Sequence, residues 1–284
     1  MNIVIFTFTK DSASMTQRSC LLDSFEKTKF VFDNYEILQN TSGTNTLFLA
    51  QTDKESVFYE SIDEAFVSQT NIVPDVLIFL TKHQSASGIN SLSCHTQGNW
   101  AKADFGGKDG VVAPCPVRLF NDVFQSIQKH NTLDFESIIE VTHHGPFVTT
   151  PSLWIEIGSN EDAWVRKDAG NVLKNVVLEV LPHCTLDISD TKEVLLGIGG
   201  MHHSPEFAKR ILRNEAWVSH VCPKYMLETV SYEALVSAYE HSYPKPTAIC
   251  YDWKSMTAKD SVVPMVEKLA QEKGLKILKT KNFK

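Results

Sequence analysis

The chain has 284 residues, of which 43% are hydrophobic and 21% charged, and this composition excludes a disordered or collagen-like protein. A chain of this length can bury roughly 75% of the surface that it exposes when unfolded, which is enough for one large domain or two small ones. The formal net charge of −7 at pH 7 argues against a protein that coats nucleic acid through a general positive field. It does not exclude a local basic face.

The six cysteines are far apart and form no C-x-x-C pair, which is typical of reduced, buried thiols in an intracellular protein. The first apolar run is short, has no basic region before it and ends at Lys10, so it predicts a first strand and not a signal peptide. No stretch approaches the roughly 18 consecutive apolar residues of a membrane span. We therefore expect a cytoplasmic protein with no membrane partner.

Short apolar, β-branched runs alternate along the chain with segments of helical pattern. We expect strands at 3–8, 46–50, 76–80, 91–95, 138–141, 194–198 and 248–251. We expect helices at 14–26, 117–129, 160–181, 205–215, 232–241 and 262–273. This alternation predicts an α/β fold with a central, mostly parallel or mixed sheet and helices on both faces. Residues 1–284 are interpreted as a single domain, with two lobes as an alternative.

A glycine turn follows the predicted strand 194–198. Gly199 and Gly200 lead through His202 to Ser204 and Pro205, and we expect the Ser204 hydroxyl to cap the helix that follows. In an open α/β sheet such a junction is where ligands bind, because glycine permits close approach and a helix start offers free N–H groups to an anion. The alternative is an ordinary tight turn.

Six of the ten histidines follow predicted strands: His83, His95, His143, His144, His202 and His203. If these strands are parallel in one sheet, their ends converge on one rim. Neutral imidazoles at that rim can bind zinc and leave a position for a water molecule, or act as general acids and bases. Glu140, Glu156 and Asp104 are close enough in sequence to orient a histidine or a water molecule. Each single histidine is explained as well by a structural hydrogen bond, so the prediction depends on the set.

Several familiar motifs are missing from the sequence. There is no H-E-x-x-H helix, no G-x-S-x-G elbow, no P-loop and no complete dinucleotide fingerprint. The remaining histidines are interpreted as structural or surface residues: His130, His183, His220 and His241. The tryptophans show no paired spacing and are interpreted as packing residues.

Several segments, in one order, resemble the archaeal and plant type of D-aminoacyl-tRNA deacylase. They are residues 79–88, 95–100, 140–146, 156–164, 197–202, 223–225 and 252–254, and the resemblance spans roughly residues 1–275. It implies a phosphorylase- or peptidyl-tRNA-hydrolase-like fold, bound zinc, and hydrolysis of the ester between a D-amino acid and the 3′-terminal ribose of tRNA. Met201 and His203 depart from the expected glycine-turn motif, and Thr81 and Lys82 stand where serine and arginine are more usual.

These observations assign candidate roles to residues. The expected catalytic residues are His83, His95, His143, His144 and His202. The expected zinc ligands are His143, His144, His202 and Glu156, and His83 or His95 would handle the proton of the leaving ribose oxygen. The expected substrate contacts are Ser85, Ser87, Gly98, Asn99, Gly145, Pro146, Gly199, Gly200 and Lys224.

Two other functions stay open at this point. A nucleoside phosphorylase or nucleosidase would use Gly199, Gly200 and the helix after Ser204 as a phosphate cradle, and a zinc- or RNA-binding module would bind without turnover. The expected partner is the 3′ end of D-aminoacyl-tRNA and not DNA, for a monomer or small homo-oligomer. Residues 268–284 hold six lysines and one acidic residue, so this basic tail is either a solvated end or a contact for tRNA phosphates.

Overall fold

The computed structural model describes residues 1–187 and 191–283. Its strands are β1 Asn2–Phe8, β2 Glu26–Phe32, β3 Tyr35–Asn40, β4 Thr46–Thr52, β5 Val76–Lys82, β6 Ser91–His95, β7 Cys115–Pro116, β8 Glu136–Ile139, β9 Ser152–Gly158, β10 Val194–Ile198, β11 Trp217–Cys222, β12 Ser242–Tyr243, β13 Ala248–Tyr251 and β14 Lys276–Lys279. Its α-helices are α1 Ser12–Leu21, α2 Ile62–Thr70, α3 Val117–His130, α4 Glu161–Trp164, α5 Lys167–Val180, α6 Pro205–Leu212, α7 Tyr232–Glu240 and α8 Lys259–Lys273.

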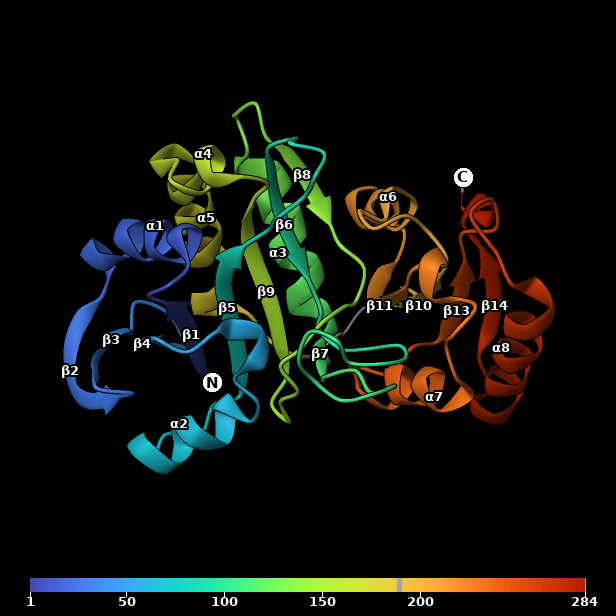
Figure 1. The fold of residues 1–284 in the computed structure, drawn as a ribbon, viewed down its shortest axis with the longest axis horizontal. Coiled ribbons are helices and arrows are strands. Elements are labelled where there is room, and N and C mark those ends of the chain that lie inside the picture. The colour runs from blue at the N-terminus through green and yellow to red at the C-terminus, as the bar shows by residue number, and fades with distance from the viewer. Residues whose placement is uncertain (188–190, 284) are drawn as a thin grey trace.

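Two sheets organise the described residues. The larger has eight strands in the order β2-β3-β4-β1-β5-β9-β6-β8, and the smaller has four in the order β11-β10-β13-β14. Figure 1 shows the two sheets next to each other, with α1, α4 and α5 on one side of the larger sheet and α2 on the other. The predicted α/β class, with a mixed sheet and helices on both faces, is confirmed.

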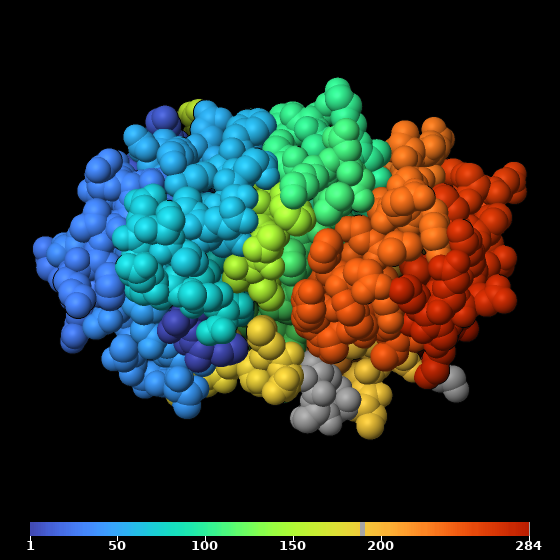
Figure 2. Space-filling model, turned by 90° about the horizontal axis from the view of Figure 1, so that it is seen from below, coloured from blue at the N-terminus to red at the C-terminus, as the bar shows by residue number. Residues whose placement is uncertain are grey.

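One hydrophobic cluster runs through both sheets. It joins Ile78 and Ile155 of the larger sheet to Val218 and Cys250 of the smaller one, through Phe124 of the strongly amphipathic helix α3. A second cluster lies on the opposite face of the larger sheet, under α2. Seen from below, α2, the loop 101–112 and α7 share one face of the molecule (Figure 2). The first cluster packs the two sheets together, and the single-domain organisation stays a prediction.

Several predicted helices have different bounds from those expected. The predicted helix 160–181 is two helices, because the backbone of Arg166 is extended and separates α4 from α5. The predicted helix 14–26 ends at Leu21, and its last residue begins β2. The sequence prediction also missed β2, β3, β9, β11, β14 and α2. In the described ranges, no helix is long and apolar enough to cross a membrane.

The strand directions overturn the assumption of one common rim. β5 and β9 are parallel, whereas β6 runs antiparallel to β9 and parallel to β8, and β10 belongs to the smaller sheet. In this register Glu156, in the middle of β9, lies between Thr81 of β5 and Ser93 of β6. The histidines therefore gather around the middle of β9, at the junction of the two sheets.

Candidate active site

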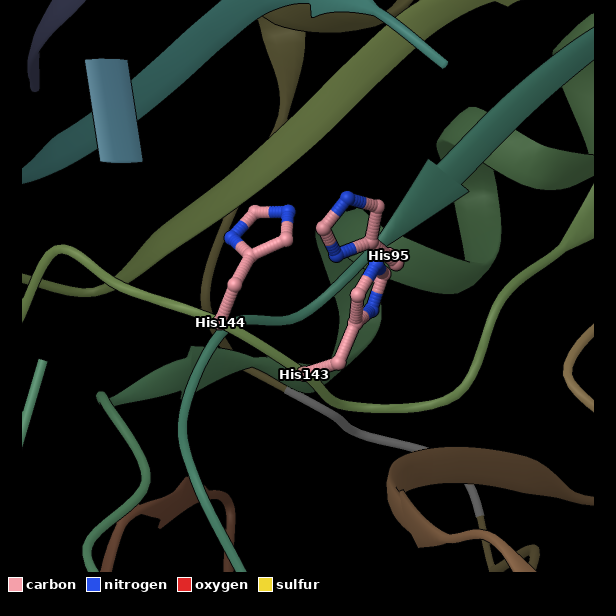
Figure 3. A group of neighbouring side chains, drawn as sticks. All are labelled: His95, His143 and His144. Atoms are coloured by element: carbon pink, nitrogen blue, oxygen red, sulfur yellow. The ribbon is translucent and has the colours of Figure 1, made fainter. Parts of the chain in front are cut away.

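Three histidines form the centre of the site. His95 ends β6, and His143 and His144 follow β8; one ring nitrogen from each lies within 4.8 Å of the others. Figure 3 shows the three rings turned toward one another. His95 is buried and His143 and His144 are half-buried, and Trp154 of β9 packs against His95 and His144 with ring centroids 5.6 and 4.6 Å away. We call His95, His143 and His144 the first histidine group.

Backbone carbonyls fix the orientation of this first group. The Nδ1–H groups of the three rings donate to the carbonyl oxygens of neighbouring residues: Thr96 for His95 (3.1 Å), Val141 for His143 (2.8 Å) and Gly145 for His144 (2.7 Å). This tautomer leaves each Nε2 with its lone pair. Burial lowers the pKa of His95 to about 4 and that of His144 to about 3, so these imidazoles are neutral.

Two glycines shape the loops that carry the first group. Gly98 has a φ of +140° and its N–H donates to the carbonyls of His143 and His144, and a Cβ there would lie 2.2 Å from Val112. Gly145 donates to the carbonyl of Phe105, and a Cβ at this position would lie 2.3 Å from the backbone of Gly106. Only glycine fits at these two close backbone contacts.

Glu140 organises a second group beside the first. Its Oε2 accepts hydrogen bonds from Nδ1–H of His83 and Nε2–H of His202, both at 2.9 Å. Burial alone raises the pKa of Glu140, but the hydrogen bonds from His202 and His83 outweigh it and hold the carboxyl well below its usual range. Burial lowers the pKa of His83, but the hydrogen bond and charge of Glu140 prevail and raise it. We call His83, Glu140 and His202 the second group.

Glu156 lies between the two groups as a buried acid. Its Oε1 accepts a hydrogen bond of 2.7 Å from the Thr81 hydroxyl, and its Oε2 lies 3.8 Å from His83 and 3.7 Å from His95. Burial, reinforced by the nearby charge of Glu140, raises the pKa of Glu156 well above its usual range. The pKa values of two buried carboxyl groups that face the same histidines are therefore shifted in opposite directions.

A polar network supports the first group from the smaller sheet. The hydroxyls of Thr96 and Thr142 lie 2.7 Å apart, and each lies 3.2 Å from Nδ1 of His220 on β11. Thr96 follows His95 and Thr142 precedes His143, so the network fixes both loops. The prediction that His220 is structural agrees with this position, because its buried ring lies behind the site.

Two cavities meet at His202. The first, of about 660 Å³, contains His83, His143, His144 and Glu156, and it is also lined by Lys10, Lys54 and Lys82; we call it the lysine cavity. Phe105, which is 67% exposed, lies at its edge. The second, of about 770 Å³, is lined by six apolar residues, among them Phe124, Ile138 and Leu212, and by six polar ones, among them His202 and Lys209; we call it the apolar cavity because most of its surface is apolar.

Comparison with known proteins identifies the family. The model of the D-aminoacyl-tRNA deacylase family matches residues 70–278. D-aminoacyl-tRNA deacylases of Pyrococcus furiosus and Thermococcus onnurineus are 33% and 34% identical to this chain, over 97% of it and 99% of their own length. The chain belongs to the D-aminoacyl-tRNA deacylase family. The predicted resemblance is confirmed, and with it the enzyme class, a hydrolase.

The fold also matches a solved structure along its whole length. A crystal structure of a conserved protein of unknown function superposes with a TM-score of 0.87 at 26% identity, covering 100% of this chain and 96% of the other. The mixed sheet and its helices are therefore a shared architecture.

The structure divides the expected zinc ligands of this deacylase between different sets. His143 and His144 combine with His95, His202 combines with His83 and Glu140, and Glu156 combines with His95 and Glu140. Asp104 lies outside them, paired with Lys102 on the surface.

The sequence prediction missed Trp154 as a neighbour of the histidines. Trp154 lies near the start of β9, and this strand was not predicted. The prediction also missed Lys10 and Lys54, which are distant in sequence from any histidine.

The expected substrate contacts of the deacylase have varied positions. Ser85 lines the apolar cavity, and its hydroxyl lies 3.0 Å from that of exposed Ser87. Asn99 donates to the carbonyl of Gly106, and Pro146 accepts from Gln97, so both stabilise the histidine loops. Lys224 lines neither cavity.

The glycine turn is also satisfied within the protein. The N–H of Gly199 donates to the carbonyl of Cys222, and that of Gly200 donates to the Ser255 hydroxyl. Ser204 begins α6 as predicted, but it does not cap the helix, because its hydroxyl donates back to the carbonyl of Met201. The expected anion cradle therefore has its glycine donors already occupied.

Proposed function

We propose that this chain hydrolyses the ester of D-aminoacyl-tRNA, in the cytoplasm, with the help of a zinc ion held by His95, His143 and His144. One observation carries the proposal: three neutral imidazoles are fixed through Nδ1–H by backbone carbonyls, and one nitrogen of each lies within 4.8 Å of the others. Membership of the deacylase family supports the substrate, a D-amino acid joined to tRNA.

The first group fits zinc by its chemistry. Nε2 of His95 is buried without a hydrogen-bond partner, which is costly unless another species uses its lone pair. Histidine ligands of metals usually donate their other N–H to a carbonyl or carboxylate, and all three rings do so. Three protein ligands leave a fourth position open, and zinc there would lower the pKa of a bound water toward about 7 and polarise the ester carbonyl.

The second group is suited to moving a proton. Glu140 holds Nδ1–H of His83 and raises the pKa of the ring, and Nε2 of His83 has no hydrogen-bond partner. We assign to His83 the transfer of a proton to the leaving ribose oxygen as its bond to the acyl carbon breaks. The products are the free D-amino acid and tRNA with a 3′-hydroxyl. His95 is less suited to this step, because its low pKa keeps it neutral.

The lysine cavity suits the 3′ end of tRNA. Lys10, Lys54 and Lys82 give part of this cavity a local positive charge, although Asp11 and Glu55 also line it, Lys54 lies 3.6 Å from Asp33, and the chain as a whole carries −7. A transient contact with a few phosphates requires such a local field and not a basic protein. Exposed Phe105 offers a face on which a base can stack.

Occupied glycine donors argue against a phosphorylase. The phosphate cradle of that alternative needs free N–H groups at Gly199 and Gly200, and both donate within the protein. Within the basic tail, Lys268, Lys273 and Lys276 pair with carboxylates, and Lys279 lies over the ring of Trp253.

The test combines stereochemistry with metal content. Purified protein is incubated with D- and L-tyrosyl-tRNA, with and without a chelator, and bound zinc is counted by mass spectrometry. We expect cleavage of the D-ester alone, loss of cleavage on chelation and rescue by zinc. Activity that survives complete zinc removal would contradict the metal assignment, and a second zinc per chain would assign the second group to metal binding as well.

A further inference from the structure

We infer that the apolar cavity is the subsite for the side chain of the aminoacyl group; this rests on the proposed function. The cavity of about 770 Å³ lies within the size range of ligand pockets. Its walls come from three elements, with Phe124 on α3, Ile138 on β8, and Ala208 and Leu212 on α6. None of these four residues forms a hydrogen bond with the histidine groups. The cleavage of the ester therefore does not require them, and another role is needed for this part of the cavity.

The apolar cavity borders the reaction site. His202 lines both cavities, and its Nε2 donates to Glu140 of the second group. A substrate whose acyl carbon lies near His83 and His202 therefore has one opening toward the lysines and another toward the apolar walls. The two cavities differ in the number of their charged groups: Lys10, Lys54 and Lys82 line one together with Asp11 and Glu55, whereas Lys209 and Glu136 line the other.

An aminoacyl ester has the same two-part chemistry. Its nucleotide side is anionic and its amino-acid side carries a group that is often apolar. Placing the phosphates near Lys10, Lys54 and Lys82 leaves the side chain on the far side of His202, against the apolar walls. The opposite placement would put phosphates against Phe124 and Ile138, which is unfavourable because apolar side chains cannot pair with their charge.

Exposed apolar side chains mark the opening of this subsite. Met201 is 54% exposed and Leu212 is 42% exposed, although both line the cavity. Glu136 and Lys209 provide a polar rim. A bulky D-side chain would cover the two apolar groups and gain their burial, whereas D-alanine would gain little. The subsite therefore favours large side chains.

The test fills the cavity and compares two substrates. Ala208→Phe adds a ring inside the subsite, and Arg213→Phe adds the same ring just beyond the end of α6 as the matched control. The kcat/KM of each variant is divided by that of the wild type for D-tyrosyl-tRNA and, separately, for D-alanyl-tRNA, so that differences between the tRNAs cancel. We expect Ala208→Phe to lower the ratio for D-tyrosyl-tRNA by about tenfold or more and that for D-alanyl-tRNA by less than about twofold. Arg213→Phe should change neither.

A second variant keeps the test informative if Ala208→Phe does not fold. Leu212→Ser removes an apolar contact at the exposed rim, and we expect KM for D-tyrosyl-tRNA to rise several-fold with unchanged KM for D-alanyl-tRNA. Equal losses on both substrates would overturn the inference. It would also be overturned if Leu212→Ser converted a dimer to a monomer and left the kinetics on D-tyrosyl-tRNA unchanged, because the surface would then be an interface with a second copy of the chain. Wild-type protein inactive on every D-aminoacyl-tRNA would instead contradict the proposed function.

Discussion

The two histidine groups of the site lie side by side, but different acceptors orient them. His95, His143 and His144 donate to backbone carbonyls, which are neutral, whereas His83 and His202 donate to the carboxylate of Glu140. The ring centroids of His143 and His202 are only 4.8 Å apart. The two groups therefore differ in the charge of their acceptors, and repulsion between neighbouring histidines further lowers the pKa values of His143 and His144.

This difference separates two chemical roles. A neutral acceptor fixes the orientation of the ring but does not stabilise the positive charge of the protonated imidazole. The pKa of the histidine therefore falls, and the Nε2 lone pair stays available to a metal. A carboxylate acceptor compensates for that charge, so the pKa of His83 rises and the ring can hold a proton. In the proposed function, the same residue type provides zinc ligands and an acid within one site.

The largest effect is expected from removing a member of the first group. His144→Ala deletes one of three ligands, so bound zinc should fall below one equivalent and single-turnover deacylation should drop by more than about a hundredfold. Exposed His183 serves as the control, and His183→Ala should keep both zinc and activity. If His144→Ala kept full activity and a normal zinc content, the first group would not be the zinc site, and the proposed division into a metal-binding group and a proton-transfer group would be wrong.

A smaller loss is expected from neutralising the acceptor of the second group. Glu140→Gln keeps the shape of the side chain but removes the charge that raises the pKa of His83, so burial then lowers that pKa. Because the proposed acid is protonated His83, activity falls as pH rises through this pKa, and the alkaline limb of the pH–rate profile should move to lower pH. We expect kcat to fall by about ten- to a hundredfold with zinc retained. An unchanged alkaline limb would show that His83 is not the acid.

The lysine cavity should affect substrate binding and not the chemical step. Lys10→Gln should raise KM for D-tyrosyl-tRNA several-fold without changing kcat, because it removes one proposed phosphate contact and no group of the chemical step. The slope of log KM against log salt concentration should become shallower by about 1. Lys27→Gln, on distant β2, is the matched control and should change neither quantity. A loss in kcat instead would place Lys10 in the chemical step.

Local sequence patterns were sufficient to predict part of this architecture. The strands that end near His83, His95 and His202 are apolar runs followed by breaks, so their positions could be read directly from the sequence. The sequence analysis did not predict β9, and it therefore did not place Glu156 between the two histidine groups. The seven residues of β9 are all buried, and a charged residue within such a run contradicts the usual pattern of a strand.

The composition of each group could not be predicted, because it depends on pairing between distant strands. The parallel pairing of β6 with β8 brings His95 to the loop after β8, and the second sheet brings His202 to Glu140. Sequence proximity suggested Glu156 as a ligand beside His143 and His144. The fold instead places Glu156 opposite Ser93 and beside His83 and His95.

The smallest effect is expected at an exposed counterpart of the His83–Glu140 pair. On the surface of α3 and α5, Glu179 accepts hydrogen bonds from Lys129, Ser126 and His130, and these lower the pKa of Glu179 to about 2. A lowered carboxyl pKa contributes stability above the unfolded value of 4.5, and this contribution is lost as pH falls toward about 2. Solvent screens this exposed cluster, so Glu179→Gln should lower the free energy of unfolding by less than about 1 kcal/mol near neutral pH. In urea unfolding, the difference in the free energy of unfolding between Glu179→Gln and the wild type should shrink as pH falls below 4.5. A difference that does not depend on pH would mean that packing, and not charge, stabilises the cluster.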